Sequence, residues 1–284
     1  MNNSSIVSLD IGGTTINAGR FRDGVIEVNR LVNFNAHASE DEVLKFVISC
    51  IDSVIAFDTQ AITIGVPCIV DVDQGIVFDA VNIPAWQKYP LKAALFQHYQ
   101  RDIYINNDVN CFVAGEYGFG AGQSFRDVLG ICLGTGIGSG LIINHQLHAG
   151  HNCCAGEVGG ISYLNGTIDD YCSGQFFVDH FKVNGEVLAQ QALAGDEVAI
   201  ESFKQFGQHL AKAISYLLFI IDPQMIVFGG SVAKSYPLFI ESLWQELRTF
   251  PYQGVINNLT IAKSELENAA LLGAVHLYRQ SLNE

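Results

Sequence analysis

Two stretches with the same organisation decide the fold. The chain reads IVSLDIGGTT over Ile6–Thr15 and VLGICLGTGIG over Val128–Gly138. Each begins with an apolar run of strand length and then breaks into a glycine-rich turn. Another apolar run returns after each turn, at Ile16–Phe21 and at Leu141–Ile143. We therefore predict two similar halves, each opening with a strand, a tight turn and a second strand.

Helix-like and strand-like segments alternate after each opening, and such alternation is typical of α/β layers. The helix-like segments are Asp41–Ala56, Leu91–Tyr99, Val198–Ile221 and Ala269–Tyr278, and the further strand-like runs are Ala61–Val66, Ile103–Ile105 and Met225–Phe228. The sequence thus predicts an α/β fold whose two halves face each other across a cleft.

Composition narrows the functional classes. The chain has 284 residues, of which 49% are hydrophobic, and a formal net charge of -14. That charge argues against nucleic acid as a partner, because nucleic-acid sites neutralise phosphates with basic patches. The longest apolar run, Ala213–Ile221, is too short to span a bilayer, and the first residues lack the features of a signal peptide. We expect a cytoplasmic protein with no membrane partner.

The seven cysteines form no C-x-x-C pair, so free thiols in a reducing compartment are expected. An alternative is a metal cluster of Cys153, Cys154 and Cys172 with His148 and His151. Their spacing matches no standard zinc pattern, and the free thiols are the preferred interpretation.

Asp10 stands just before the turn Gly12-Gly13-Thr14-Thr15. Paired glycines free backbone N–H groups to approach an anion, and the threonine hydroxyls add donors. A carboxylate beside a phosphate loop requires a cation, and Mg²⁺ bound by Asp10, directly or through water, supplies one. The alternative is an ordinary hairpin turn with a solvated aspartate.

A second candidate phosphate cradle is Gly134-Thr135-Gly136, again after an apolar strand. It is not the dinucleotide motif G-x-G-x-x-G, because Ser139 occupies the place of the third glycine. It is not a P-loop either, because the chain contains no Gly-Lys pair. Two glycine loops, each between strands, therefore indicate a nucleotide site of another type.

Three further motifs follow strands or lie in loops. Asp108 follows Asn106-Asn107 at the end of a strand, where a carboxylate can accept a proton from a hydroxyl that attacks phosphorus. Asn106 or Asn107 can instead cap a helix. Glu157 lies among small residues and can accept hydrogen bonds from sugar hydroxyls, or lie on a surface loop. Gly229-Gly230 follows Phe228 and suits an adenosine packed on bare backbone, or a simple turn.

Taken together, these motifs resemble those of the ROK family of sugar kinases, in the family's order. They are Asp10-x-Gly-Gly-Thr, Asn82-Ile-Pro-x-Trp86, Asn107-Asp108, Leu133-Gly-Thr-Gly-Ile-Gly138, Gly156-Glu157-Val-Gly159, Phe228-Gly-Gly230 and Leu271-Leu-Gly-Ala274. The resemblance runs from about residue 6 to about residue 278. It implies a ribonuclease-H-like, actin-like ATPase fold with the active site in the interdomain cleft. The expected domains are 1–110 with 268–284, and 111–267.

The resemblance also implies roles for individual residues. The activity would be ATP-dependent phosphorylation of a hexose or N-acetylhexosamine hydroxyl, expected at O6, with Asp108 as general base. Sugar would be held by Asn82, Asn107, Asp108, Glu157 and Asp169. ATP would be bound by Gly12, Gly13, Thr14, Thr15, Gly134, Thr135, Gly136, Gly229 and Gly230, with Mg²⁺ near Asp10. A homodimer is expected on the same ground.

The chain departs from the family pattern at the sugar end of the site. Gly160 stands where the family has a histidine that touches the sugar and binds zinc, and the C-x-C-G-x-x-G-C zinc loop is absent. Asp169 replaces a sugar-binding glutamate, and Cys68 replaces a glycine. We therefore expect no structural zinc and an altered sugar preference.

Three other functions compete with the kinase. A repressor of the same family would carry a DNA-binding segment, for which the chain has no room before Asp10. A catalytically inactive sugar-binding or regulatory ROK protein is the main alternative, favoured by Gly160 and Asp169 and opposed by Asp108. An unrelated actin-like ATPase would lack the Asn107-Asp108 and Gly156-Glu157 pairs. The sequence does not name the sugar.

Overall fold

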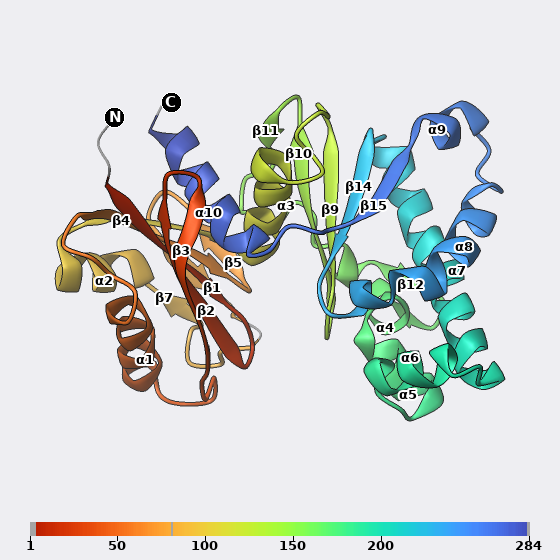
Figure 1. Cartoon of the computed structure of the whole chain (residues 1–284), viewed down its shortest axis with the longest axis horizontal. Coiled ribbons are helices and arrows are strands. Elements are labelled where there is room, and N and C mark those ends of the chain that lie inside the picture. The colour runs from red at the N-terminus through yellow and green to blue at the C-terminus, as the bar shows by residue number, and fades with distance from the viewer. Residues whose placement is uncertain (1–3, 81, 283–284) are drawn as a thin grey trace.

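The computed structural model describes residues 4–80 and 82–282 and contains two five-stranded sheets side by side (Figure 1). The strands of the first sheet, in the spatial order β3-β2-β1-β4-β8, are β3 (Val25–Asn33), β2 (Thr15–Arg22), β1 (Ser5–Ile11), β4 (Thr59–Val66) and β8 (Asp102–Asn107). The strands of the second, in the order β11-β10-β9-β14-β15, are β11 (Gln146–Leu147), β10 (Ile137–Ile143), β9 (Val128–Leu133), β14 (Met225–Gly229) and β15 (Thr260–Lys263).

The two sheets have the same topology. In each, the first three strands in sequence pair antiparallel and the last two add parallel to the first. The predicted repeat of strand, glycine turn and strand is therefore confirmed as the opening of both sheets. Strand β9 has the predicted bounds, whereas β10 begins at Ile137, before the predicted Leu141, because the turn is shorter than expected.

Helices cover the outer faces of the two sheets. On the first sheet these are α1 (Glu40–Asp52) and α2 (Leu91–Tyr99). The second sheet is covered by α4 (Ile168–Cys172), α5 (Gly174–Phe181), α6 (Gly185–Leu193), α7 (Glu197–Ile220), α8 (Tyr236–Leu247) and α9 (Gln253–Asn258), with the short helices η1 (Val158–Gly160) and η2 (Val232–Ser235). Helix α1 begins at a capping box of Ser39 and Glu42. It ends at Asp52, four residues before the predicted Ala56.

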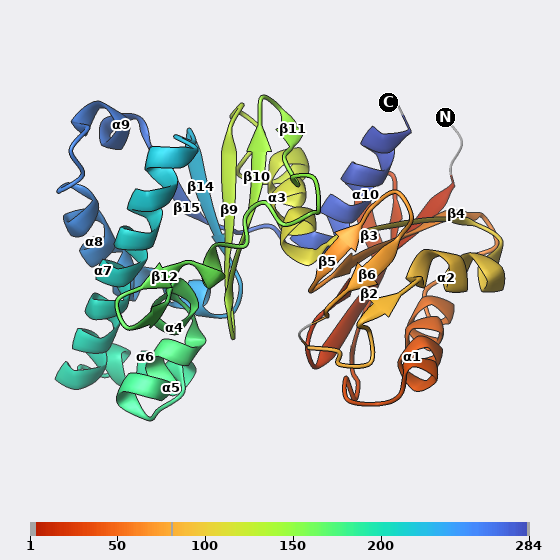
Figure 2. The same cartoon turned by 180° about the vertical axis from the view of Figure 1, so that it is seen from behind.

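Two smaller sheets accompany the two large ones. Seen from behind, β5 (Ile69–Asp71), β6 (Ile76–Phe78) and β7 (Lys88–Tyr89) form a separate small sheet beside the first (Figure 2). The hairpin of β12 (Ser162–Tyr163) and β13 (Gly166–Thr167) leads from η1 into α4. In the sequence, this hairpin stands where the ROK pattern has the zinc loop, which this chain is predicted to lack.

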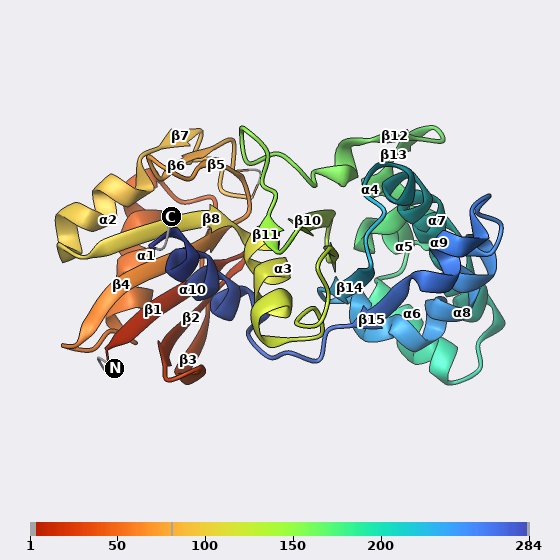
Figure 3. The same ribbon diagram turned by 90° about the horizontal axis from the view of Figure 1, so that it is seen from above.

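Two helices, α3 (Asp108–Phe119) and α10 (Ala269–Ser281), pack against each other between the sheets (Figure 3). Helix α3 packs on the second sheet through Phe112 and Val113, and α10 packs on the first through Leu272 and Val275. Gly273 makes the close crossing possible, because a Cβ there would collide with a backbone carbonyl of α3. These two helices join the sheets at the base of the cleft.

The predicted domain boundary between residues 110 and 111 falls inside α3. The division itself stays a prediction, and its outermost residues, 1–3 and 283–284, lie outside the described residues. Two separate apolar cores support it, one under each sheet. No helix within 4–80 and 82–282 is long and apolar enough to cross a membrane.

Candidate active site

The ends of strands from both sheets meet in one cavity of about 620 Å³, here called the catalytic cavity. Asp10, near the end of β1, and Asp108, at the start of α3, line it from the first sheet. Gly229 and Gly230, at the end of β14, line it from the second. The structure therefore brings together four of the predicted site residues that are far apart in sequence.

Asp108 is held at the first turn of α3, where its Oδ1 accepts a hydrogen bond from its neighbour Val109 N at 2.9 Å. Burial, together with the negative charges of Asp10 and Glu157, raises the pKa of Asp108 to about 8. Burial alone raises the pKa of Asp10 to about 6. Neither carboxylate forms an ion pair within the part of the chain that the structure describes.

The donor set fits Mg²⁺. The negative charge of Asp10 raises the pKa of Asp108, and the two lysines that line the same cavity, Lys234 and Lys263, form no ion pair with either carboxylate. A divalent cation would balance the charge of the two carboxylates. Asp10 would hold the ion, which would neutralise developing negative charge on the phosphates. Among the described residues, no group of three or more His, Cys, Asp and Glu side chains is arranged to hold a metal. The alternative cluster of Cys153, Cys154 and Cys172 is not such a group, and the prediction about zinc remains untested.

Asn107 caps α3, as the sequence allowed. Its Oδ1 accepts from Val109 N at 2.9 Å and from Asn110 N at 3.0 Å, and its Nδ2 donates to Cys68 O at 3.3 Å. The buried side chain thereby ties the end of β8 to the segment after β4. This fixes the direction in which Asp108 leaves the strand.

The first glycine turn packs against the predicted sugar segment. A Cβ built on Gly13 would lie 3.1 Å from Asn82 Cγ, so the Asn82 side chain rests directly on the turn. Val81, which precedes Asn82, lies outside the described residues. Within the turn, Gly12 N donates to Thr15 O at 2.8 Å, which leaves Gly13 and Thr14 at its tip.

The second glycine turn is buttressed by α4 and α5. Gly134 O accepts from Gly174 N at 2.7 Å, and Asp169 Oδ1 accepts from Ile137 N at 2.6 Å. One oxygen of Asp169 is therefore occupied by the turn that carries Thr135 and Gly136. The structure places Asp169 behind the candidate phosphate cradle, and its predicted role in sugar binding stays a prediction.

Glu157 precedes η1 and is close enough to Asp108 to raise its pKa. Desolvation also raises the pKa of Glu157 itself, although its side chain is exposed. Gly156 before it has φ +100°, a conformation that favours glycine, and a Cβ there would collide with Ser139 O. The Gly156-Glu157 pair is thus positioned by β10, close enough to Asp108 for the charge of Glu157 to act on it.

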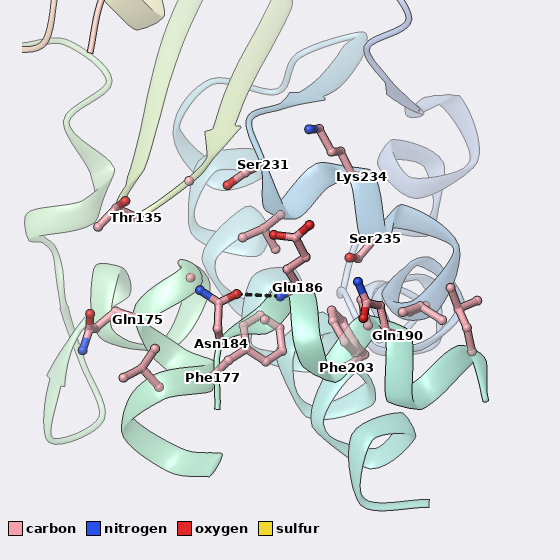
Figure 4. Close-up of a pocket in the computed structure, with 18 of the residues that line it drawn as sticks. Thr135, Gln175, Phe177, Asn184, Glu186, Gln190, Phe203, Ser231, Lys234 and Ser235 are labelled. Carbon is pink, nitrogen blue, oxygen red and sulfur yellow. Dashed lines mark hydrogen bonds between the residues drawn. The ribbon is translucent and has the colours of Figure 1, made fainter. Parts of the chain in front are cut away.

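A further pocket, of about 510 Å³, opens between the second glycine turn, α5, α6 and η2 (Figure 4). We call it the α6 pocket. Gly134, Thr135 and Ser231 lie at its rim, and Phe177 and Phe203 form part of its apolar wall. No sequence motif marks the α5, α6 and η2 residues of this pocket, because they follow ordinary amphipathic patterns between the motifs.

Comparison with known proteins agrees with the motifs. The sequence model of the ROK family matches residues 6–281. An N-acetyl-D-glucosamine kinase of Pectobacterium atrosepticum is 32% identical over 256 residues, which cover 79% of this chain and 83% of that protein.

Solved structures agree with the fold. A ROK family glucokinase from Streptomyces griseus, in complex with glucose and AMPPNP, is 26% identical and superposes with a TM-score of 0.85 over 98% of this chain and 100% of that chain. A ROK family transcriptional regulator, a homologue of the E. coli MLC protein, is 19% identical with a TM-score of 0.86 over 99% of this chain and 78% of the regulator, a likeness of fold alone. The predicted actin-like ATPase fold is confirmed. The chain therefore belongs to the ROK family, as its motifs predicted.

Proposed function

We propose that this ROK sugar kinase transfers the γ-phosphoryl group of ATP to a hydroxyl of a hexose or an N-acetylhexosamine, expected at O6. The observation that carries the proposal is the catalytic cavity, in which Asp108 and Asp10 of one sheet face Gly229 and Gly230 of the other. The relative named an N-acetyl-D-glucosamine kinase and the neighbour named a glucokinase support the two sugar classes.

Asp108 is the proposed general base. Its carboxylate takes the proton of the sugar hydroxyl while that oxygen bonds to the γ-phosphorus and the bond from phosphorus to the bridging oxygen of ADP breaks. A base with a pKa of about 8 in the free site holds its proton well once it has accepted it. Positive charge arriving with the nucleotide lowers that pKa toward the working pH.

The remaining predicted residues position the two substrates. Gly12 to Thr15 and Gly134 to Gly136 wrap the phosphates, with Gly229 and Gly230 beneath the adenosine, and Mg²⁺ accompanies ATP near Asp10. Asn82, Asn107, Glu157 and Asp169 are the proposed sugar contacts. Support comes from the packing of Asn82 on Gly13, which joins the sugar segment to a phosphate turn.

The proposed homodimer has a candidate surface. Near the end of α7, Tyr216, Phe219 and Ile220 are 42%, 58% and 75% exposed, which is unusual for three large apolar side chains within five residues of one helix. Size-exclusion chromatography with light scattering measures the assembly state directly.

The test of the proposed function is ADP release from Mg-ATP across a panel of hexoses and N-acetylhexosamines, with Asp108→Asn in parallel. We expect sugar-dependent turnover that falls by about 10²- to 10⁴-fold in the variant, the usual contribution of a general base, while sugar binding persists. Saturable sugar binding without turnover of any sugar by the native chain would contradict the kinase. That outcome would favour the inactive sugar-binding alternative.

A further inference from the structure

One loop, residues 148–157, links the two halves of the molecule, and we call it the bridging loop. It connects β11 to η1, which both belong to the half of the second sheet. Ala149 and Cys153 of this loop nevertheless pack into the apolar core of the first sheet. Figure 3 shows the chain leaving β11, reaching the small sheet of β5 and β6, and returning toward the second half. The loop therefore spans both halves, and Glu157, a proposed sugar contact, stands at its end.

Cys153 lies where the bridging loop meets the first half. Its backbone has φ +56°, a conformation that favours glycine and costs energy for a residue with a side chain. A hydrogen bond from Ala155 N to Ala149 O at 3.0 Å closes the loop around it. A strained residue keeps its conformation only where surrounding contacts hold it in place. The side chain of Cys153 makes such contacts.

The thiol of Cys153 belongs to a buried network at the start of α3. Asn110 Nδ2 donates to Cys153 Sγ at 3.4 Å, and the thiol donates to Asn106 Oδ1 at 3.6 Å. Asn110 Nδ2 also donates to Asn106 Oδ1 at 3.1 Å, so the three buried side chains form a closed triangle. Burial raises the pKa of the thiol, which therefore keeps the proton that it donates.

This network surrounds the proposed general base in the sequence. Asn106 stands two residues before Asp108, and Asn110 stands two residues after it. The proposed function gives neither asparagine a role, although both belong to the same motif as Asp108. Their contact with Cys153 ties the bridging loop to the two sides of this motif.

The other end of the bridging loop is held by the second sheet. Gly156 O accepts hydrogen bonds from Ser139 N at 3.1 Å and from Ser139 Oγ at 2.8 Å. The short segment from Cys153 to Glu157 is thus fixed at one end by the residues around Asp108 and at the other by β10. Two fixed ends limit where the Glu157 carboxylate can lie relative to Asp108.

We propose that the contact between Cys153 and Asn110 positions Glu157 to bind the sugar beside Asp108. Cys153 and Asn110 are positioning residues, because they act through Glu157 and not on the substrate. Without this contact the strained backbone at Cys153 relaxes, and Glu157 loses its fixed place. The inference rests on the proposed function, and it adds the contact that holds the two sides of the sugar site together.

Titration calorimetry tests the contact, with whichever of glucose and N-acetylglucosamine the native chain phosphorylates. Cys153→Ala and Asn110→Ala should each weaken sugar binding by about tenfold, the usual value of a hydrogen bond to a charged group such as Glu157. ADP affinity should stay unchanged, since the bridging loop lies outside the residues proposed to hold ADP. Cys154→Ala is the matched control, because Cys154 is the neighbouring cysteine and is exposed.

Cys153→Gly separates positioning from stability. Glycine adopts φ +56° without strain but carries no thiol. This variant should therefore be at least as stable as Cys153→Ala in urea unfolding, and yet bind the sugar as weakly. Sugar binding at the native level in a folded Cys153→Gly would overturn the proposal.

A double-mutant cycle shows whether Cys153 acts through Glu157. Glu157→Ala alone should weaken sugar binding, and adding Cys153→Ala should cause little further loss, because the group that Cys153 positions is already gone. A merely structural role for Cys153 predicts losses that add. Additive losses, or an equal loss in Cys154→Ala, would contradict the positioning role.

These failures differ from a failure of the proposed function. Each of them leaves a native chain that binds sugar and releases ADP from Mg-ATP. A native chain that binds neither sugar would overturn the proposed function, and this inference with it.

Discussion

The two sheets share one topology but carry different side chains at corresponding strand ends. Asp10 and Cys132 occupy equivalent positions, each one residue before the last antiparallel pair at its glycine turn. Both line the catalytic cavity. Burial raises the pKa of the Cys132 thiol well above its usual range, so this thiol stays neutral where Asp10 offers a carboxylate.

The other corresponding strand ends also differ in the charge and polarity of their residues. Strand β8 leads to Asp108, whereas its counterpart β15 ends in Lys263. Strand β4 is followed by Pro67 and Cys68, whereas its counterpart β14 ends in Gly229 and is followed by Gly230. In the proposed function, one sheet supplies the acidic groups for proton transfer and for a cation. The other supplies bare backbone and lysines, which suit the nucleotide.

The largest expected difference between the two sheets is a difference in kcat between substitutions at Asp10 and at Cys132. Asp10→Asn should lower kcat by about 100-fold, as loss of a metal-supporting group commonly does. Cys132→Ser, an equally small change at the equivalent position, should alter kcat little. Steady-state kinetics at several Mg²⁺ concentrations checks both variants, and excess Mg²⁺ should partly restore Asp10→Asn. Similar losses in the two variants would show that the sheets do not divide the chemistry in this way.

A second effect concerns Gly230, which follows β14 in the second sheet, the sheet proposed to bind the nucleotide. Gly230 has φ +87°, and a Cβ there would collide with Leu133 O. Gly230→Ala should therefore lower the free energy of unfolding by about 1–3 kcal/mol and weaken ADP binding. Gly254→Ala, on α9, is the matched control, because its Cβ would meet no atom within 4 Å.

Urea unfolding measures the stability of both glycine variants, and calorimetry measures their ADP affinity. The prediction is contradicted if Gly254→Ala is as damaging as Gly230→Ala. In that case the positive φ of Gly230 would not be the feature on which stability and ADP affinity depend.

Much of this site was predictable because it lies at strand ends. An apolar run followed by Asp10 or Asp108 indicates a carboxylate at the carboxyl edge of a sheet, where clefts of α/β proteins form. Glu186 and Lys234, which line the α6 pocket, carry no such signal. They stand on surface turns of α6 and η2 and approach one pocket only because the helices pack together.

Asp169 shows a limit of another kind. The family pattern aligns it with a sugar-binding glutamate, but the side chain is one carbon shorter and one oxygen is taken by Ile137 N. Which group a carboxylate meets depends on distances that the pattern does not contain. The edge strand β3 was missed although the Asp23-Gly24 turn before it, with both residues at positive φ, is a strong hairpin signal.

A smaller effect appears in the pH dependence of stability. The pKa of Asp108 is raised from 3.8 to about 8 in the folded chain, so folding favours its protonated form. The stability that Asp108 contributes is present below the unfolded pKa and is lost as the pH rises through about 8. The Tm of Asp108→Asn relative to the native chain should therefore increase from pH 5 to pH 8 and then level off.

Thermal unfolding without ligands or metal measures this difference. Asp73→Asn, at an exposed position, is the control and should show no such trend. A constant difference between Asp108→Asn and the native chain across the range would mean that the Asp108 carboxylate is not buried in solution. The acidic character assigned to the first sheet would then need another explanation.

The smallest expected effect on stability is at Gly160, where the family has histidine. A Cβ built there meets no atom within 4 Å, so Gly160→His should change the free energy of unfolding by less than about 0.5 kcal/mol. At the adjacent Gly159 a Cβ would lie 2.8 Å from Ile137 O, so Gly159→His should destabilise the chain. The two variants therefore compare a position with free space around it, Gly160, and a tightly packed position, Gly159, on the same short helix η1.

The vacant position bears on which sugar the enzyme prefers. If Gly160 borders the sugar, an imidazole there should change the ratio of kcat/KM for glucose to that for N-acetylglucosamine while leaving ADP affinity unchanged. The substitution would then change the choice of sugar without changing nucleotide binding. An unchanged ratio would place Gly160 outside the sugar site, and the altered preference would have to come from Cys68 or Asp169.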